Sequence, residues 1–148
     1  MAHKTYDILE TSTAPIETVF AVIADAPRWS EWNKSIARAF WEVEGTEVRE
    51  GVGAIRSMGA AKGPLSREQI VSYEAPQHLA YTILSGPVPV TNYRADVHLR
   101  SLPNGGTEIS WKGEFDCRVP GVAAMLTKMV RGFAVGAARE AERQTQIS

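Results

Sequence analysis

Apolar residues recur with a helical period in two separate parts of the chain. Within residues 14–24, the i, i+3, i+4, i+7 spacing places four apolar side chains on one helical face: Ile16, Val19, Phe20 and Ile23. A longer stripe begins near Pro120 and keeps the same spacing for more than four turns, at Val122, Met125, Leu126, Met129, Val130, Phe133 and Ala137. The pattern predicts a short amphipathic helix near the N-terminus and a long one at the C-terminus.

A second short helical turn follows the first helix. Pro27 interrupts the helical pattern, and Trp29 and Trp32 then stand three residues apart, which places both rings on the same side of the next turn. Two helices of this length cannot bury such side chains against each other. They require a larger surface to pack on.

That surface is predicted between the helices, where the pattern changes to short runs broken by turn residues. Strands are predicted at residues 4–12, 36–43, 51–58, 65–73, 78–84, 90–102 and 107–117. The last two alternate apolar and polar positions, and Asn104-Gly105 between them is typical of a hairpin turn. Such a sheet has one apolar and one solvated face. The order of elements predicts an α+β domain with helices on one face of an antiparallel sheet.

Composition and charge narrow the class of protein. With 44% hydrophobic and 22% charged residues, the chain has the composition of one globular domain, residues 1–148. The net charge of −1 gives no sign of a nucleic-acid or anionic-membrane partner. No apolar run approaches the roughly 20 residues of a membrane span, so no membrane insertion is expected. Without an apolar leader segment, the expected location is cytoplasmic. The pattern leaves the oligomeric state open.

Residues with metal-binding or nucleophilic chemistry are few. His3, His78 and His98 do not have the spacing of a ligand set, and the chain has one cysteine, Cys117. No phosphate-binding loop, dinucleotide fingerprint or nucleophile elbow is present. We therefore expect neither a metal nor a cofactor.

Several short motifs, taken in order, resemble the START-like superfamily, whose other names include SRPBCC, polyketide cyclase/dehydrase-like and Bet v 1-like. The motifs are Ala14-Pro15, Val19-Phe20, Asp25, Trp29 with Trp32, and Tyr73-Glu74-Ala75-Pro76, and the resemblance covers essentially the whole chain. It implies a helix-grip fold, in which a curved seven-stranded antiparallel sheet surrounds a long C-terminal helix and two short helices follow the first strand. It also implies an apolar cavity between the helix and the sheet.

Two hypotheses of function follow from this resemblance. The first is binding or transport of a hydrophobic small molecule, such as a lipid or polyketide, in a cavity formed by Trp32, Arg56, Tyr81, Tyr93, Trp111, Met125, Met129 and Phe133. The alternative is a polyketide cyclase/dehydratase-type enzyme, with Glu10, Glu68 or a tyrosine as acid or base. The opposite expectation for these carboxylates is that they pair with cations or reach solvent. A third class, a protein-interaction module, would expose a large apolar patch.

Overall fold

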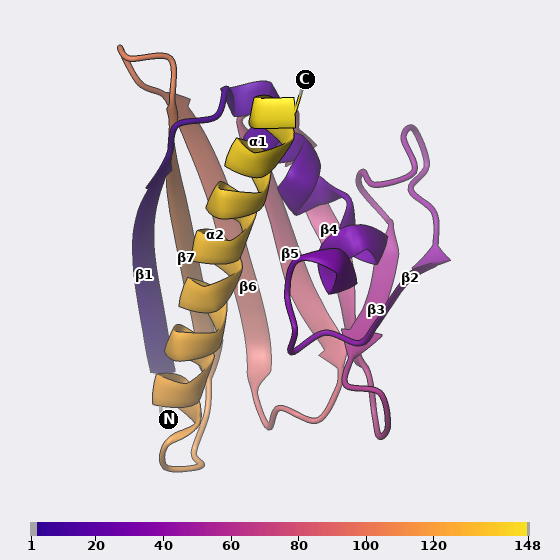
Figure 1. Cartoon of the computed structure of the whole chain (residues 1–148). Coiled ribbons are helices and arrows are strands. Elements are labelled where there is room, and N and C mark those ends of the chain that lie inside the picture. The colour runs from indigo at the N-terminus through magenta and orange to yellow at the C-terminus, as the bar shows by residue number, and fades with distance from the viewer. Residues whose placement is uncertain (1–2, 148) are drawn as a thin grey trace.

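A curved sheet surrounds one long helix in the computed structural model, which describes residues 3–147 (Figure 1). Within these residues the sheet has seven strands: β1 (His3–Ser12), β2 (Arg38–Val43), β3 (Ile55–Gly59), β4 (Ser66–Glu74), β5 (His78–Ser85), β6 (Thr91–Ser101) and β7 (Thr107–Asp116). The helices are α1 (Ile16–Ala24), the 3-10 helix η1 (Ala26–Glu31) and α2 (Val122–Ile147). None of the described helices is long and apolar enough to cross a membrane.

The strands are arranged in the order β1-β7-β6-β5-β4-β3-β2, and every neighbouring pair is antiparallel. After β1 the chain passes through α1 and η1 to the far edge of the sheet, and then returns strand by strand to β7. The helix α2 crosses the concave face, while α1 and η1 lie beside its C-terminal part (Figure 1). The structure confirms the predicted helix-grip fold.

Alternation along the strands decides which side chains face α2. On β6, Tyr93, Ala95, Val97 and Leu99 are all at most 5% exposed, and the residues between them point to the outer face. The same holds on β7 for Ile109, Trp111 and Phe115. The inner face is therefore the core of the protein, as the sequence pattern predicts.

The two tryptophans after α1 pack the short helices α1 and η1 against α2. Trp29 is 1% exposed, its Nε1 donates a hydrogen bond to the Ile23 carbonyl oxygen over 3.1 Å, and its ring centre is 5.3 Å from that of Trp32. A Cβ at Gly136 of α2 would lie 2.8 Å from the Trp32 ring, whereas one at Gly132 would meet nothing within 4 Å. Close packing therefore explains Gly136 but not Gly132.

The predicted element boundaries differ most from the structure in the third strand. The sequence pattern predicts a start at residue 51, but β3 begins at Ile55. Gly53 has a φ of 91°, and the Gly51 N–H donates to the Val48 carbonyl oxygen, so this segment is a turn. Similarly, β2 begins at Arg38 instead of residue 36.

Candidate functional site

A cavity of about 350 Å³ lies between the concave face of the sheet and α2. Its walls are mostly apolar, and they come from β3, β4, β5, β6, the turns between these strands, the segment between η1 and β2, and α2. The lining residues are Ser35, Ile36, Met58, Gly59, Ala60, Lys62, Pro64, Ser66, Glu68, Tyr81, Ile83, Pro87, Val88, Tyr93, Leu126, Met129, Val130 and Phe133. Six of them, Ser35, Ala60, Lys62, Pro64, Pro87 and Met129, are solvent-exposed and surround the opening, called the mouth below.

Five of the residues singled out in the sequence line this cavity. Tyr81 and Tyr93 face it from adjacent strands, and Met129 and Phe133 face it from successive turns of α2. Glu68, one of the two candidate acid–base residues, reaches it from β4. Strand alternation and the helical period together bring these side chains, which are far apart in the sequence, to one space.

Four other candidate residues lie close to the cavity without lining it. Trp111 is fully buried behind Tyr81, and its Nε1 donates a hydrogen bond to the Tyr81 hydroxyl over 3.2 Å. Arg56 is 1% exposed and lies next to Glu68. Trp32 and Met125 line a shallow hollow beside the mouth.

Glu10, the second acid–base candidate, lies away from the cavity. Its carboxylate accepts a hydrogen bond from the Thr11 N–H over 2.9 Å and forms an ion pair of 3.3 Å with Arg139 of α2. The neighbouring inward position, Ser12, is buried, and its hydroxyl donates to the Ala138 carbonyl oxygen. On this edge of the sheet the polar side chains therefore attach β1 to α2.

A buried ion pair lies at the wall of the cavity. Arg56 Nε donates a hydrogen bond to Glu68 Oε1 over 3.0 Å, and Arg56 Nη2 lies 3.0 Å from the same oxygen. The other carboxylate oxygen accepts a hydrogen bond from the Ser66 hydroxyl over 3.1 Å. The Glu68 side chain is 13% exposed, so a molecule in the cavity can contact it.

The Arg56 guanidinium is packed between two aromatic rings. Its central carbon lies 4.5 Å from the centre of the Tyr81 ring and 5.0 Å from that of Trp29. Within the described residues neither Nη1 nor Nη2 has a hydrogen-bond partner of good geometry, although Nη2 is close to Glu68. The Glu68 carboxylate and the two rings therefore compensate most of the cost of burying this cation.

Three tyrosine hydroxyls form a polar cluster at the inner face. The hydroxyls of Tyr6 and Tyr93 are hydrogen-bonded to each other, and the Tyr81 and Tyr93 rings are 6.0 Å apart. Burial, and then the Glu68 carboxylate, raise the pKa of Tyr81 to about 12. Burial also raises the pKa values of Tyr6 and Tyr93 well above the usual tyrosine value. All three hydroxyls are therefore neutral near pH 7 and offer hydrogen bonds without charge.

Sequence reasoning missed most of the apolar wall. Ile36, Met58, Ile83, Leu126 and Val130 all line the cavity. Leu126 and Val130 belong to the apolar stripe of the last helix, so helical periodicity was a signal for them. Met58 and Ile83 carry no comparable signal, because it is the curvature of the sheet that turns their positions toward a space instead of a filled core.

A second hollow, of about 480 Å³, lies between α1 and the β2–β3 loop. Its floor includes Phe20 and Tyr73, but three carboxylates, Glu17, Asp25 and Glu50, line it as well. A hydrophobic ligand that enters this hollow would lie against charged groups. The cavity under α2 is the better candidate site for such a ligand.

The outer face of the sheet brings two histidines together, which the sequence spacing did not predict. His78 and His98 are opposite each other on β5 and β6, and their rings stack with centres 4.3 Å apart. With Asp96 they offer three possible metal ligands within 4.8 Å of one another. However, Asp96 already accepts hydrogen bonds from His78 over 2.8 Å and from Arg94 over 3.0 Å. The Arg94 cation occupies one side of this cluster.

A family of known proteins has the same sequence pattern. The family described as polyketide cyclase / dehydrase and lipid transport matches residues 6–143. The chain belongs to this family. A search of curated protein sequences found no match.

Solved structures of other proteins show the same fold. A protein from Nitrosospira multiformis superposes with a TM-score of 0.77 at 20% identity, covering 97% of this chain and 99% of that one. A START superfamily protein from Mycobacterium smegmatis gives 0.74 at 12% identity, covering 99% and 100%. The Zhui aromatase/cyclase from a Streptomyces species gives 0.77 at 16% identity, covering 97% and 96%. The chain therefore shares the fold of these proteins, and its family is the one described by polyketide cyclisation, dehydration and lipid transport.

Proposed function

We propose that this protein binds or transports a hydrophobic small molecule, such as a lipid or polyketide, in the cavity between the sheet and α2. The observation that carries the proposal is the cavity itself, an apolar space with a polar wall. Its volume of about 350 Å³ lies within the range of small-molecule sites, roughly 300–1,000 Å³. Membership of a family described by lipid transport and polyketide cyclisation supports the same class of ligand.

The distribution of polar groups indicates how such a ligand would be oriented. Met129, Val130 and Phe133 of α2 would contact its apolar part. Glu68 and Tyr93 line the cavity with a carboxylate and a neutral hydroxyl, so a hydroxyl or carbonyl group of the ligand would bind there. A few polar groups in an apolar site fix orientation, whereas the apolar area supplies most of the affinity.

Filling the cavity tests this proposal. Ile83 lines the cavity, and its neighbour Leu84 is 45% exposed, so Ile83→Trp and Leu84→Trp add the same side chain inside and outside the site. We expect the neutral fluorescent probe N-phenyl-1-naphthylamine to bind the wild type and Leu84→Trp with similar affinity. Ile83→Trp should bind at least tenfold more weakly, because an indole would occupy much of the space.

Native mass spectrometry of the purified protein provides a second readout. A co-purifying small molecule should be present in the wild type and in Leu84→Trp, and absent from Ile83→Trp. If Ile83→Trp, correctly folded by circular dichroism, binds the probe as well as the wild type does, the ligand site lies elsewhere and the proposal is wrong.

A second candidate function is catalysis on a polyketide, and the position of Glu68 favours it. This carboxylate lines the cavity beside Tyr81 and Tyr93, where it can accept a proton from a carbon next to a ligand carbonyl. Turnover of a polyketide substrate by the wild type, lost in Glu68→Gln with probe binding retained, would support an enzyme. Equal turnover by both proteins would refute a role for Glu68 as the base.

A further inference from the structure

The chain segments at the end of the molecule where the cavity opens carry cations but no carboxylates. Four chain segments, residues 33–38, 59–65, 86–92 and 117–132, contribute residues to the mouth or adjoin it at the same end of the molecule (Figure 1). They contain no Asp or Glu, but they contain six cations, called the basic end below: Lys34, Arg38, Lys62, Arg118, Lys128 and Arg131. All seventeen carboxylates and the other ten cations belong to the rest of the chain.

The six cations also differ from the others in their partners. No ion pair within residues 3–147 includes a residue of the basic end, whereas eight of the other ten cations pair with a carboxylate. Arg38 instead donates to the carbonyl oxygens of Ala60 and Gly63, each over 2.7 Å, and so holds the β3–β4 turn in place. The positive charge at this end is therefore not neutralised within the described chain.

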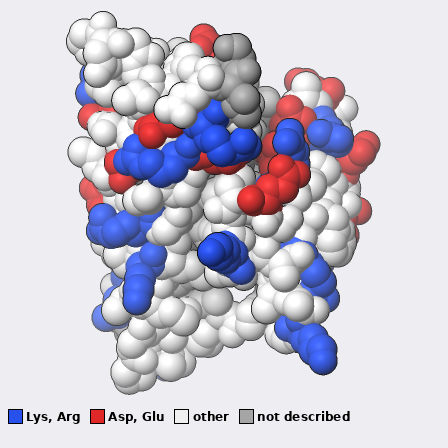
Figure 2. Space-filling model, in the orientation of Figure 1, with Lys and Arg blue, Asp and Glu red and all other residues white. Residues whose placement is uncertain are grey.

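Exposed apolar side chains lie among these cations. Val119 is 49% exposed, Met125 47% and Met129 36%. Met125 and Met129 line the shallow hollow beside the mouth together with Lys34 and Lys128. In Figure 2 the lower part of this face is white with only Lys and Arg among the charged residues, while Asp and Glu gather in the upper part. The mouth thus opens in a surface that is both apolar and positively charged.

We propose that the basic end docks on an anionic lipid surface and holds the mouth of the cavity against it. A negatively charged bilayer surface strengthens binding about fivefold for each nearby Lys or Arg, and apolar side chains such as Met125 bury favourably at its interface. The separation of charge also orients the molecule, because the carboxylate-rich end is repelled. The net charge of −1 conceals this surface, since carboxylates elsewhere in the chain offset the six cations.

A lipid surface explains the position of this charge better than an acidic protein does. Lys62 lies at the mouth of an apolar cavity, and Lys34 and Lys128 line the hollow beside it. A hydrophobic ligand is concentrated in a bilayer. Docking in this orientation lets the ligand pass between bilayer and cavity with little exposure to water. This inference rests on the proposed function, because a filled or unused cavity would give no reason for docking at its mouth.

Binding to lipid vesicles tests the proposal. We expect the wild type to sediment with vesicles of equal parts phosphatidylglycerol and phosphatidylcholine at about 0.1 M salt, and to be released at about 1 M, where charges are screened within a few ångströms. Vesicles of phosphatidylcholine alone should not retain it. The triple variant Lys34→Gln, Lys128→Gln and Arg131→Gln should lower the partition coefficient about 100-fold, since three cations are lost.

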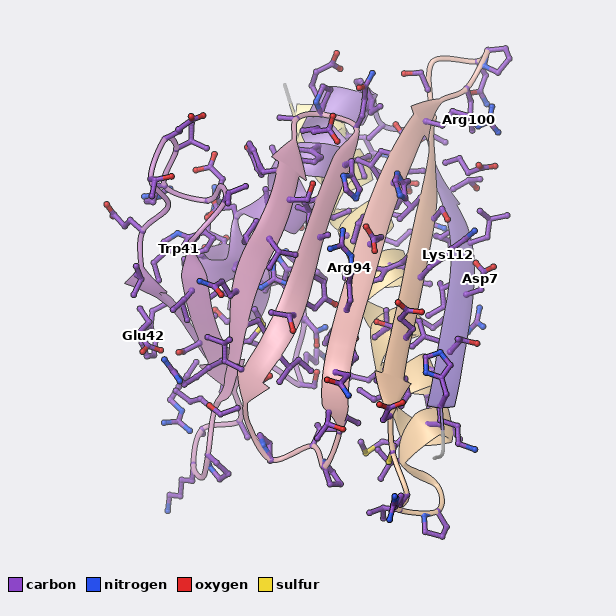
Figure 3. The ribbon with its side chains drawn as sticks, turned by 180° about the vertical axis from the view of Figure 1, so that it is seen from behind. Asp7, Trp41, Glu42, Arg94, Arg100 and Lys112 are labelled. Atoms are coloured by element: carbon purple, nitrogen blue, oxygen red, sulfur yellow. The ribbon has the colours of Figure 1, made fainter. Side chains whose placement is uncertain are left out.

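A matched control changes three cations away from the mouth. Arg49→Gln, Arg100→Gln and Lys112→Gln give the same net charge, and Arg100 and Lys112 lie on the outer sheet face (Figure 3). This control should bind anionic vesicles within about threefold of the wild type. The double variant Val119→Ser and Met125→Ser should weaken binding about tenfold, because both side chains are half exposed in the free protein.

Two results would overturn docking while leaving the proposed function intact. One is probe binding in the cavity without any binding to anionic vesicles, which is also the result expected if the basic end serves an acidic protein. The other is an equal loss of vesicle binding in both triple variants, which would show that net charge and not the basic end is responsible. If the wild type does not bind the probe at all, the proposed function itself is refuted.

Discussion

The buried ion pair between Arg56 and Glu68 makes a quantitative prediction about the stability of the site. Arg56 is 1% exposed and Glu68 13%, and the guanidinium is packed against Trp29 and Tyr81. Glu68→Leu would leave this cation buried without a carboxylate, and an arginine cannot release its proton to avoid the cost. Removing one partner of such a pair costs about 3–5 kcal/mol.

Substitution of the arginine instead of the glutamate should lower the free energy of unfolding by less. In Arg56→Met the Glu68 carboxylate remains hydrogen-bonded to Ser66 and lies at the cavity wall, where water can hydrate it. In the double variant Arg56→Met/Glu68→Leu no charge is buried. An apolar pair of similar volume should restore the free energy of unfolding to within about 1 kcal/mol of the wild type.

Urea titration at pH 7, followed by tryptophan fluorescence and circular dichroism, measures all four proteins. With a urea dependence of about 2 kcal/mol per molar, typical for a small domain, Glu68→Leu should lower the midpoint by about 1.5–2.5 M. The double-mutant cycle should give a coupling energy of at least about 2 kcal/mol. The reasoning is refuted if Glu68→Leu costs less than about 1 kcal/mol, or if the two single losses add up in the double variant.

Two further predictions concern the helix glycines and the tyrosines. Gly132→Ala should raise the free energy of unfolding by up to about 1 kcal/mol, because alanine favours the helix and its Cβ meets open space. Gly136→Ala should lower the free energy of unfolding, since the new Cβ would lie 2.8 Å from the Trp32 ring. Equal denaturant midpoints for the two variants would contradict this difference between the two glycines. In alkaline titration the unfolded chain loses the Tyr81 proton near pH 10 and the folded protein near pH 12. The contribution of Tyr81 to stability should therefore be fully present below pH 10 and be lost between pH 10 and 12, with a decrease of about 3 kcal/mol in the free energy of unfolding. Absorbance at about 295 nm should show no Tyr81 or Tyr93 ionisation in the folded protein at pH 10.5, and a full tyrosinate signal there would refute the assignment.

The strands and helices could be predicted because each carries its own local pattern. The clean alternation of β6 and β7 and the helical stripe of α2 each have one apolar face, and the structure buries that face. The prediction was least accurate at residues 51–54, where alternating apolar residues form a turn. There Gly53 adopts a positive φ, so the chain turns although its apolar residues alternate as in a strand. Sequence periodicity does not detect such a backbone conformation.

Candidate site residues were harder to predict. Alternation indicates on which face of the sheet a side chain lies, but not which residues of other elements lie next to it. Glu10 and Glu68 are both strand carboxylates with ambiguous surroundings in the sequence. The structure pairs Glu10 with Arg139 at the edge of the sheet and places Glu68 at the cavity wall beside Arg56. The difference arises because α2 packs closely against β1, whereas β4 lies across the cavity from it, a long-range relation that no local spacing contains.

The sequence by itself determined the elements, their order and the family to which the chain belongs, since these depend on local periodicity and on short motifs. Only the tertiary structure decided that a space of about 350 Å³ remains under α2, because cavity volume depends on how far the helix stands from the sheet. It also decided that six cations without an ion pair in the described chain gather at the end of the molecule where that space opens. They come from separate segments of a chain whose net charge is −1, and only folding brings them to one end of the molecule.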